Sequence, residues 1–337
     1  MSRRRHLLEM VPGLDRRFPV QNLLEGPTPV TEAQELAQLW KLRSLWIKRD
    51  DLTSPAYGGS KVRNLEYFLG HAKLQGLSTL ATMGPQGSHQ ALATAVHGAA
   101  CGFRTRSLLL PQQACSETEL NRRLLPAFGM QVLRCEHWYE APLAYARTRW
   151  GGEPAYWIPP GSKHPIGVLG IIEGALELAA AIANKELSCP DDVVVPTGTC
   201  ATAAGLYLGF AMARLPVRLV AVRLVPMMIT GPGKMRRLAE QTLALLRICG
   251  YRDPVDWGES LWIDDYAAPG YGIGNASSEA AARDVVALGA FRTEVTYTEK
   301  CLGLLADRKL ADRNVLFWNT YSAVDPLAPV HSARTAS

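Results

Sequence analysis

The sequence lacks the features that define several classes of protein. Only 20% of its 337 residues are charged and 47% are apolar, so it has too few charges for a disordered chain. Its net charge of +5 comes from basic residues that are scattered, apart from Arg3-Arg4-Arg5 and a few pairs. Nucleic acid is therefore a weak candidate partner.

Paired cysteines are also missing. The seven cysteines form no Cys-x-x-Cys motif, which argues against a disulfide framework or a zinc site and predicts reduced, mostly buried thiols. The segment after the first arginines is broken by Glu9 and Pro12 and does not resemble a signal peptide. We expect a cytoplasmic protein with no metal.

One long run without charge extends from residue 193 to 213, enough to cross a bilayer by length alone. Pro196, Gly198 and three early threonines favour a strand, a turn and a helix instead. We therefore expect no membrane partner.

Short runs rich in Val, Ile and Leu alternate with longer helical patterns, which predicts an α/β fold with parallel sheets and helices on both faces. The length suits two domains or one large doubly wound domain. Strands are expected at 45–47, 79–83, 106–110, 131–133, 192–195, 217–222 and 315–318. Helices are expected at 31–42 with a capping box from Thr31 to Gln34, then at 60–74, 88–100, 117–128, 166–184, 201–215, 234–249, 277–288 and 299–306, and one ending at 150. The tail from Pro326 is expected to fray.

Lys61 is the first candidate for chemistry. It follows Gly58-Gly59-Ser60, where two glycines permit a sharp turn and Ser60 can cap a helix. In the first helical turn the helix dipole disfavours an ammonium group and lowers the pKa of Lys61, which suits Schiff-base chemistry. The alternative is a solvated helix lysine.

Two further turns lie between a strand and a helix. In Gly84-Pro85-Gln86-Gly87-Ser88-His89-Gln90, backbone N–H groups and side chains converge as they do around a carboxylate. The segment from Pro196 to Gly205 is rich in hydroxyls and suits a phosphate, yet it lacks both the P-loop ending and the Gly-x-Gly-x-x-Gly pattern. Either could be an ordinary capped turn. Together with Lys61, however, they suggest pyridoxal 5′-phosphate, whose aldehyde needs a lysine and whose phosphate needs such a turn.

The residues from Ile47 to Pro55, followed by those from Gly58 to Glu66, resemble the signature of the 1-aminocyclopropane-1-carboxylate deaminase and D-cysteine desulfhydrase family. These are fold-type II, tryptophan synthase β-like pyridoxal-phosphate enzymes. The resemblance also covers 24–30, the two turns, 270–273 and 297–300.

The resemblance implies a role for each matching residue. Lys61 would form the Schiff base and shuttle a proton at the substrate α-carbon, while Ser88, with His89 and Gln90, would bind the substrate carboxylate end. Tyr271 and Tyr297 would place catalytic phenols over the substrate. The cofactor phosphate would be held by Gly198, Thr199, Cys200, Ala201 and Thr202. His89 would face the cofactor ring oxygen, and Thr298 or Thr320 would lie beside the pyridine nitrogen.

Several positions depart from the family pattern. The residue before the lysine, usually Asn, is Ser60, and the usual Asn after Ser88 is His89. Cys200 replaces a glycine, which is tolerable only if its φ is negative. Tyr321 adds bulk where the family has glycine, and Glu294 replaces an aspartate. These departures suggest an altered substrate or reaction.

By resemblance, residues 1–59 and 166–337 would form a large cofactor-binding domain, and 60–165 a small inserted domain that closes over the substrate. A homodimer is expected on the same ground. The expected activity is that of a lyase or deaminase that releases ammonia and a 2-oxo acid from a small amino acid resembling 1-aminocyclopropane-1-carboxylate or D-cysteine. The alternatives are a β- or γ-replacement synthase and a non-catalytic binding protein that kept the fold.

Overall fold

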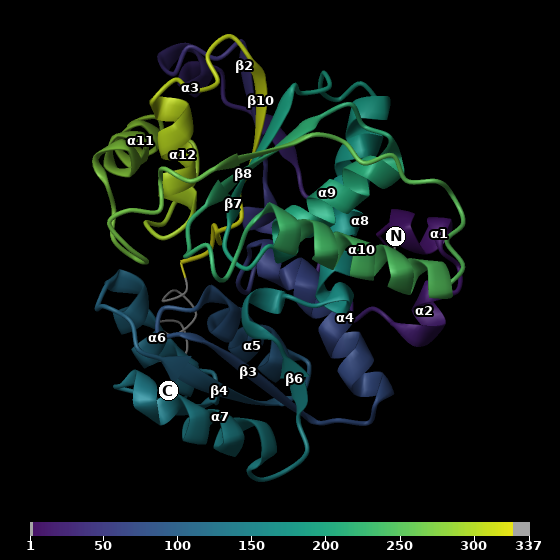
Figure 1. Cartoon of the computed structure of the whole chain (residues 1–337), viewed down its shortest axis with the longest axis vertical. Helices are drawn as coiled ribbons and strands as arrows, with labels where there is room; N and C mark the ends of the chain where they lie inside the picture. The colour runs from purple at the N-terminus through teal and green to yellow at the C-terminus, as the bar shows by residue number, and fades with distance from the viewer. Residues whose placement is uncertain (1–2, 326–337) are drawn as a thin grey trace.

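The computed structural model describes residues 3–325, which form two parallel sheets wrapped by helices (Figure 1). The larger sheet has six strands, and only the pairing of the first two is antiparallel. Their order across the sheet is β1 (Val30–Glu32), β2 (Ser44–Lys48), β10 (Asn314–Trp318), β7 (Asp192–Thr197), β8 (Arg218–Arg223) and β9 (Ser260–Ile263). The expected fraying from Pro326 concerns residues outside the described range.

Helices cover both faces of this sheet because its central strands are apolar on both sides. In β7, Val193 and Val195 pack into one core cluster and Val194 into another, as the two-residue period of a strand requires. One face carries α8 (Pro165–Ala183), α9 (Ala201–Ala213) and α10 (Pro232–Ile248). The other carries α3 (Gln34–Leu39), α11 (Ala276–Ala287) and α12 (Thr298–Ala306) (Figure 1).

The smaller sheet has four parallel strands in the order β5 (Gln131–Arg134), β4 (Arg104–Leu110), β3 (Thr79–Pro85) and β6 (Tyr156–Ile158). In β4, Leu109 packs with α5 (His89–Ala100), whereas Leu108 packs with α7 (Ala141–Trp150) on the opposite face. The remaining helices are α1 (His6–Met10), α2 (Leu14–Arg17), α4 (Ser60–Leu74) and α6 (Ser116–Ala127), with short 3-10 turns η1 (Asp50–Leu52), η2 (Trp138–Glu140) and η3 (Pro160–Ser162).

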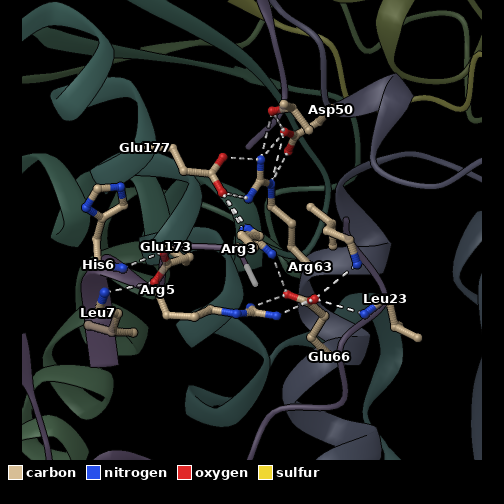
Figure 2. A network of polar contacts seen from close by, with 12 residues as sticks. Arg3, Arg5, His6, Leu7, Leu23, Asp50, Arg63, Glu66, Glu173 and Glu177 are labelled. Atoms are coloured by element: carbon tan, nitrogen blue, oxygen red, sulfur yellow. Dashed lines mark hydrogen bonds and ion pairs between the residues drawn. The ribbon is translucent and has the colours of Figure 1, made fainter. Parts of the chain in front are cut away.

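Helix α4 packs against α8, and a buried ion network lies on the side of α4 that faces α8 (Figure 2). Arg63 of α4 donates to both oxygens of Asp50 at 2.9 Å and to Glu177 of α8 at 2.8 Å. The helices approach closely because α8 has glycine where it crosses Arg63: a Cβ on Gly170 would lie 1.9 Å from the Arg63 carbonyl oxygen.

The N-terminal arm completes this network. Arg3 forms ion pairs with Glu66 and Glu177, and Arg5 pairs with Glu66 at 2.7 Å. The amides of His6 and Leu7 both donate to the Glu173 carboxylate at 2.8 Å (Figure 2). Residues at the start of the chain therefore hold α4 and α8 together.

The predicted α/β fold class is confirmed, with two kinds of error in the elements. The helix expected at 31–42 is wrong at its start, since Thr31 pairs with Ile47 in the sheet and no capping box forms there. Strands β1, β6 and β9 and helices α1 and α2 were not predicted, because each has only three to five residues. The strand, turn and helix expected at 193–213 are confirmed.

Helix α8 is the one helix of the described residues long and apolar enough to cross a membrane, with a mean hydropathy of 1.9, but 78% of that stretch is buried inside the protein. It packs as a core helix against α4 and α9. All seven cysteines are unpaired and four of them are buried, as predicted.

Candidate active site

A cavity of about 620 Å³ lies where both sheets present the carboxyl ends of their strands, the usual place for a ligand in an α/β fold. The turn after β3 contributes Ser88, and the turn after β7 contributes Gly198 and Thr199. All but one of the predicted site residues line this cavity: Lys61, Ser88, His89, Gln90, Gly198, Thr199, Cys200, Ala201, Thr202, Tyr271, Tyr297 and Thr320.

Lys61 stands at the cavity wall in the first turn of α4. The turn before it needs glycine, because Gly59 has a φ of +98° and a Cβ there would lie 2.7 Å from the Thr320 carbonyl oxygen. Lys61 Nζ donates to the Gly161 carbonyl at 3.1 Å. Burial lowers the pKa of Lys61 to about 8. The predicted direction is confirmed, although the cause is loss of water and not the helix dipole.

Asp50 fixes the backbone on both sides of Lys61. Its carboxylate accepts from Ser60 Oγ at 3.0 Å and from Arg63 Nε at 2.9 Å. Asp50 was part of the recognised signature but received no role. Its contacts show that it is a positioning residue for the lysine.

The hydroxyl-rich turn opens α9 as expected. Thr199 Oγ1 donates to the Gly161 carbonyl at 3.0 Å, so Gly161 receives both this hydroxyl and the Lys61 amine. A Cβ on Gly198 would lie 3.1 Å from the Tyr297 ring. The turn and the phenol therefore approach each other closely.

The expectation that Cys200 needs a negative φ is wrong. Its φ is +74° and its ψ is −4°, so it adopts the left-handed conformation that favours glycine. The turn from β7 into α9 imposes this conformation on whichever residue occupies it. The side chain is buried, with Sγ 2.7 Å from Thr230 Oγ1, and it does not cap α9. The first N–H groups of the helix are left for another acceptor.

Ser88 is the N-cap of α5 and accepts from the Ala91 amide at 3.3 Å. Gln90 also lines the cavity, but its side-chain amide is hydrogen-bonded to other protein groups. It donates to Thr82 Oγ1 at 2.6 Å and to Pro159 O at 2.9 Å, and it accepts from Ser162 Oγ at 3.1 Å. Gln90 thus supports the turn that carries Gly161.

Tyr271 and Tyr297 meet over the cavity, with their phenol oxygens 2.9 Å apart and their rings edge to face. Burial raises the pKa of Tyr297 to about 12 and that of Tyr271 well above its usual value. Lys300 holds the Tyr271 loop, because its Nζ donates to Ala267 O at 2.9 Å and Gly270 O at 2.6 Å. Lys300 had no predicted role, since nothing local marks a lysine as buried.

His89 and Thr298 differ from expectation in their surroundings. His89 Nδ1 lies 3.2 Å from the Tyr57 hydroxyl and Nε2 lies 3.5 Å from a Glu294 carboxylate oxygen. Thr298 is the predicted residue that does not line the cavity, because its hydroxyl bonds the Glu294 amide at 2.8 Å and carbonyl at 3.0 Å at the start of α12. Thr320 remains as the candidate neighbour of a pyridine nitrogen.

A family model described as "Pyridoxal-phosphate dependent enzyme" matches residues 22–320 of this sequence. The chain belongs to this family. It is 32% identical over 300 residues to D-cysteine desulfhydrases from Salmonella paratyphi B and Salmonella newport, covering 86% of this chain and 88% of each relative. Pyridoxal phosphate is its cofactor, as predicted, and it is an enzyme of the deaminase and desulfhydrase-like lyase kind.

Solved structures share the fold. A structure described as an "ACC deaminase homologue" matches with a TM-score of 0.77 at 23% identity, covering 98% of both chains. A threonine deaminase isoform from Solanum lycopersicum matches with a TM-score of 0.61 at 14% identity, covering 98% of this chain and 88% of that one. The predicted fold-type II class is therefore confirmed.

The residues present fit this cofactor. Lys61 offers an amine of lowered pKa at the cavity wall, and the uncapped start of α9 offers N–H groups and the Thr199 and Thr202 hydroxyls to a phosphate. Glycine at 198 leaves room between this turn and Tyr297.

Proposed function

We propose that the protein is a lyase or deaminase that releases ammonia and a 2-oxo acid from a small amino acid, of the kind represented by 1-aminocyclopropane-1-carboxylate or D-cysteine. The observation that carries this proposal is that one cavity collects a lysine of lowered pKa, an open helix start, a Ser-capped turn and a pair of phenols. The D-cysteine desulfhydrase relatives support it.

Bound pyridoxal phosphate supplies an aldehyde for amines and a ring that accepts carbanionic charge. Lys61 would hold the cofactor, and Gly198, Thr199, Cys200, Ala201 and Thr202 would surround the phosphate. With a pKa of about 8, the Lys61 amine is suited to take or return a proton at the substrate α-carbon near neutral pH.

Ser88 and the amides beside it would bind the substrate carboxylate at the start of α5, where the helix dipole favours an anion. The Tyr271 and Tyr297 phenols are protonated at neutral pH, as ordinary phenols are, and burial raises the pKa of both further. They would therefore act over the substrate as hydrogen-bond donors and acids, not as bases.

We also propose that residues 60–165 form the small domain that closes over the substrate, with the large domain formed by 1–59 and 166–337. All four strands of the smaller sheet fall between Thr79 and Ile158, which supports this division. Closure would exclude water from the carbanion. A cytoplasmic homodimer, with neither nucleic acid nor membrane as partner, completes the proposal.

The test is spectroscopic. Purified enzyme should show the absorption of a lysine-linked cofactor, and Lys61→Ala should lose it. A screen of small D- and L-amino acids should then give a 2-oxo acid plus ammonia. If a new amino acid forms only with an added nucleophile, the enzyme is a replacement synthase. If no amino acid changes the spectrum or exchanges its α-proton, the proposal of turnover fails.

A further inference from the structure

His89 is the first residue of α5, and its side chain crosses the cavity from the smaller sheet toward groups carried by the larger one. Nδ1 lies 3.2 Å from the Tyr57 hydroxyl, and Nε2 lies 3.5 Å from Glu294 Oε2. The ring also packs edge to face on Tyr321, with centroids 5.1 Å apart. No other member of the Ser88 turn described so far makes such contacts.

Glu294 is a fixed partner. Its Oε1 accepts from the amides of Tyr297 and Thr298, and its Oε2 accepts from the amide of Thr296, each at 2.8 Å. Burial acts to raise the pKa of Glu294, but His89 and these amides together hold it below its usual value. The carboxylate is therefore an anchored negative charge facing His89 from the turn before α12.

The separation of 3.5 Å is longer than a good hydrogen bond, and Nε2 is a buried nitrogen without a hydrogen-bond partner. A small movement of the Ser88 turn toward Glu294 would close this distance. Tyr57, Tyr297 and Tyr321 also surround the His89 ring.

We propose that His89 and Glu294 are a positioning pair that draws the Ser88 turn across the cavity and thereby sets the affinity for the substrate carboxylate. The inference rests on the proposed function, in which that turn binds the carboxylate. Closing the gap between His89 Nε2 and Glu294 Oε2 would bring the Ser88 turn toward Glu294, so the loss of either partner should weaken binding of the carboxylate.

The test uses the holoenzyme and propanoate, a carboxylate without an amino group. Calorimetric titrations of the wild type and of each variant, at one pH and one ionic strength, give the Kd of this carboxylate.

His89→Asn and Glu294→Asp should each weaken binding by about 3–10-fold, and the double variant should be no worse than either. Aspartate can still accept from the neighbouring amides, so Glu294→Asp shortens the side chain toward His89 and keeps the carboxylate. His89→Gln replaces His89→Asn if the latter does not fold. Glu299→Asp, in the first turn of α12, shortens a nearby carboxylate and should leave binding unchanged.

The cofactor absorption is recorded in every titration, which separates two outcomes. If the lysine-linked absorption is absent, the proposed function fails. If the absorption is normal but both single variants bind as tightly as the wild type, or the two single effects simply add, the positioning pair is wrong.

Discussion

Lys61 and Arg63 lie two residues apart on α4 and face different surroundings. Arg63 is fully buried between Asp50 and Glu177; burial opposes its charge, but these carboxylates hold the pKa of Arg63 well above its usual value. Lys61 forms no ion pair with any residue in the range 3–325, and burial lowers its pKa to about 8. Burial with a counterion gives a permanent charge, whereas burial without one gives an amine that can lose its proton near neutral pH.

The ion network and the cavity also differ in how completely their contacts are satisfied. The network around Arg63 pairs every carboxylate with a cation or with amides, as Glu66 is with Arg3 and Arg5. The cavity instead keeps Cys200 in a left-handed conformation, which costs about 1–2 kcal/mol, and His89 at an incomplete contact. The stabilising ion pairs therefore lie on the side of α4 that faces α8, and the reactive groups lie on the side that faces the cavity.

Breaking the network should have the largest effect. Arg63→Met leaves Asp50 and Glu177 buried without their main cation, so we expect the free energy of unfolding to fall by about 3–5 kcal/mol in urea titrations. Arg123→Met is the control, because its pair with Glu119 is exposed and should contribute no more than about 1 kcal/mol. Equal losses from both variants would contradict the comparison.

Removing one cation from the N-terminal arm should lower the free energy of unfolding by less than Arg63→Met does. Arg3→Gln takes a guanidinium from Glu66 and Glu177, but Arg5 and Arg63 still pair with them, so we expect a loss of about 1–3 kcal/mol in the same titration. The neighbouring variant Arg4→Gln removes only an exposed pair with Glu9. If it destabilises as much as Arg3→Gln, the arm does not act through its buried contacts.

Lys61→Met should raise the free energy of unfolding, whereas the two arginine substitutions should lower it. In the unfolded chain Lys61 keeps its proton up to its usual pKa of 10.5, and in the folded protein only up to about 8. Below pH 8 the buried ammonium group therefore destabilises the folded protein. This destabilisation disappears as pH rises from 8 to 10.5, where the folded protein has lost the proton. We expect cofactor-free Lys61→Met to be more stable than wild type at pH 7 by about 1–3 kcal/mol, because the cost of about 3 kcal/mol for the buried charge is partly offset by the hydrogen bond to Gly161 that the variant loses. The gain should be lost by pH 10.5. A variant that is less stable at pH 7 would show that Lys61 is satisfied by Gly161.

The smallest effect is expected at Cys200. Glycine relieves the positive φ, whereas alanine keeps it and loses the sulfur contact with Thr230. Cys200→Gly should therefore be more stable than Cys200→Ala by about 1 kcal/mol in thermal unfolding. Equal stability of the two variants would mean that the turn carries no strain.

Local patterns were enough to predict much of the fold and the site. Helix α4 was predicted with its observed bounds, and the turns at Ser88 and Gly198 follow strands as expected, because glycines, caps and apolar periods are written in neighbouring residues. What could not be predicted depends on distant parts of the chain. The positive φ of Cys200 was signalled only by the glycine that it replaces in the family pattern. Nothing near His89 reveals that Glu294 faces it, since that contact follows from how the sheets are placed.

The arm also has a consequence for synthesis of the protein. Glu66 and Glu177, which pair with Arg3, lie 63 and 174 residues after it along the chain. A ribosome adds about 5–20 residues each second, so roughly ten to thirty seconds pass between synthesis of the arm and synthesis of α8. During that interval its arginines have no partner in α8. The arm is thus synthesised well before the helix residue that it pairs with, and its buried contacts form late.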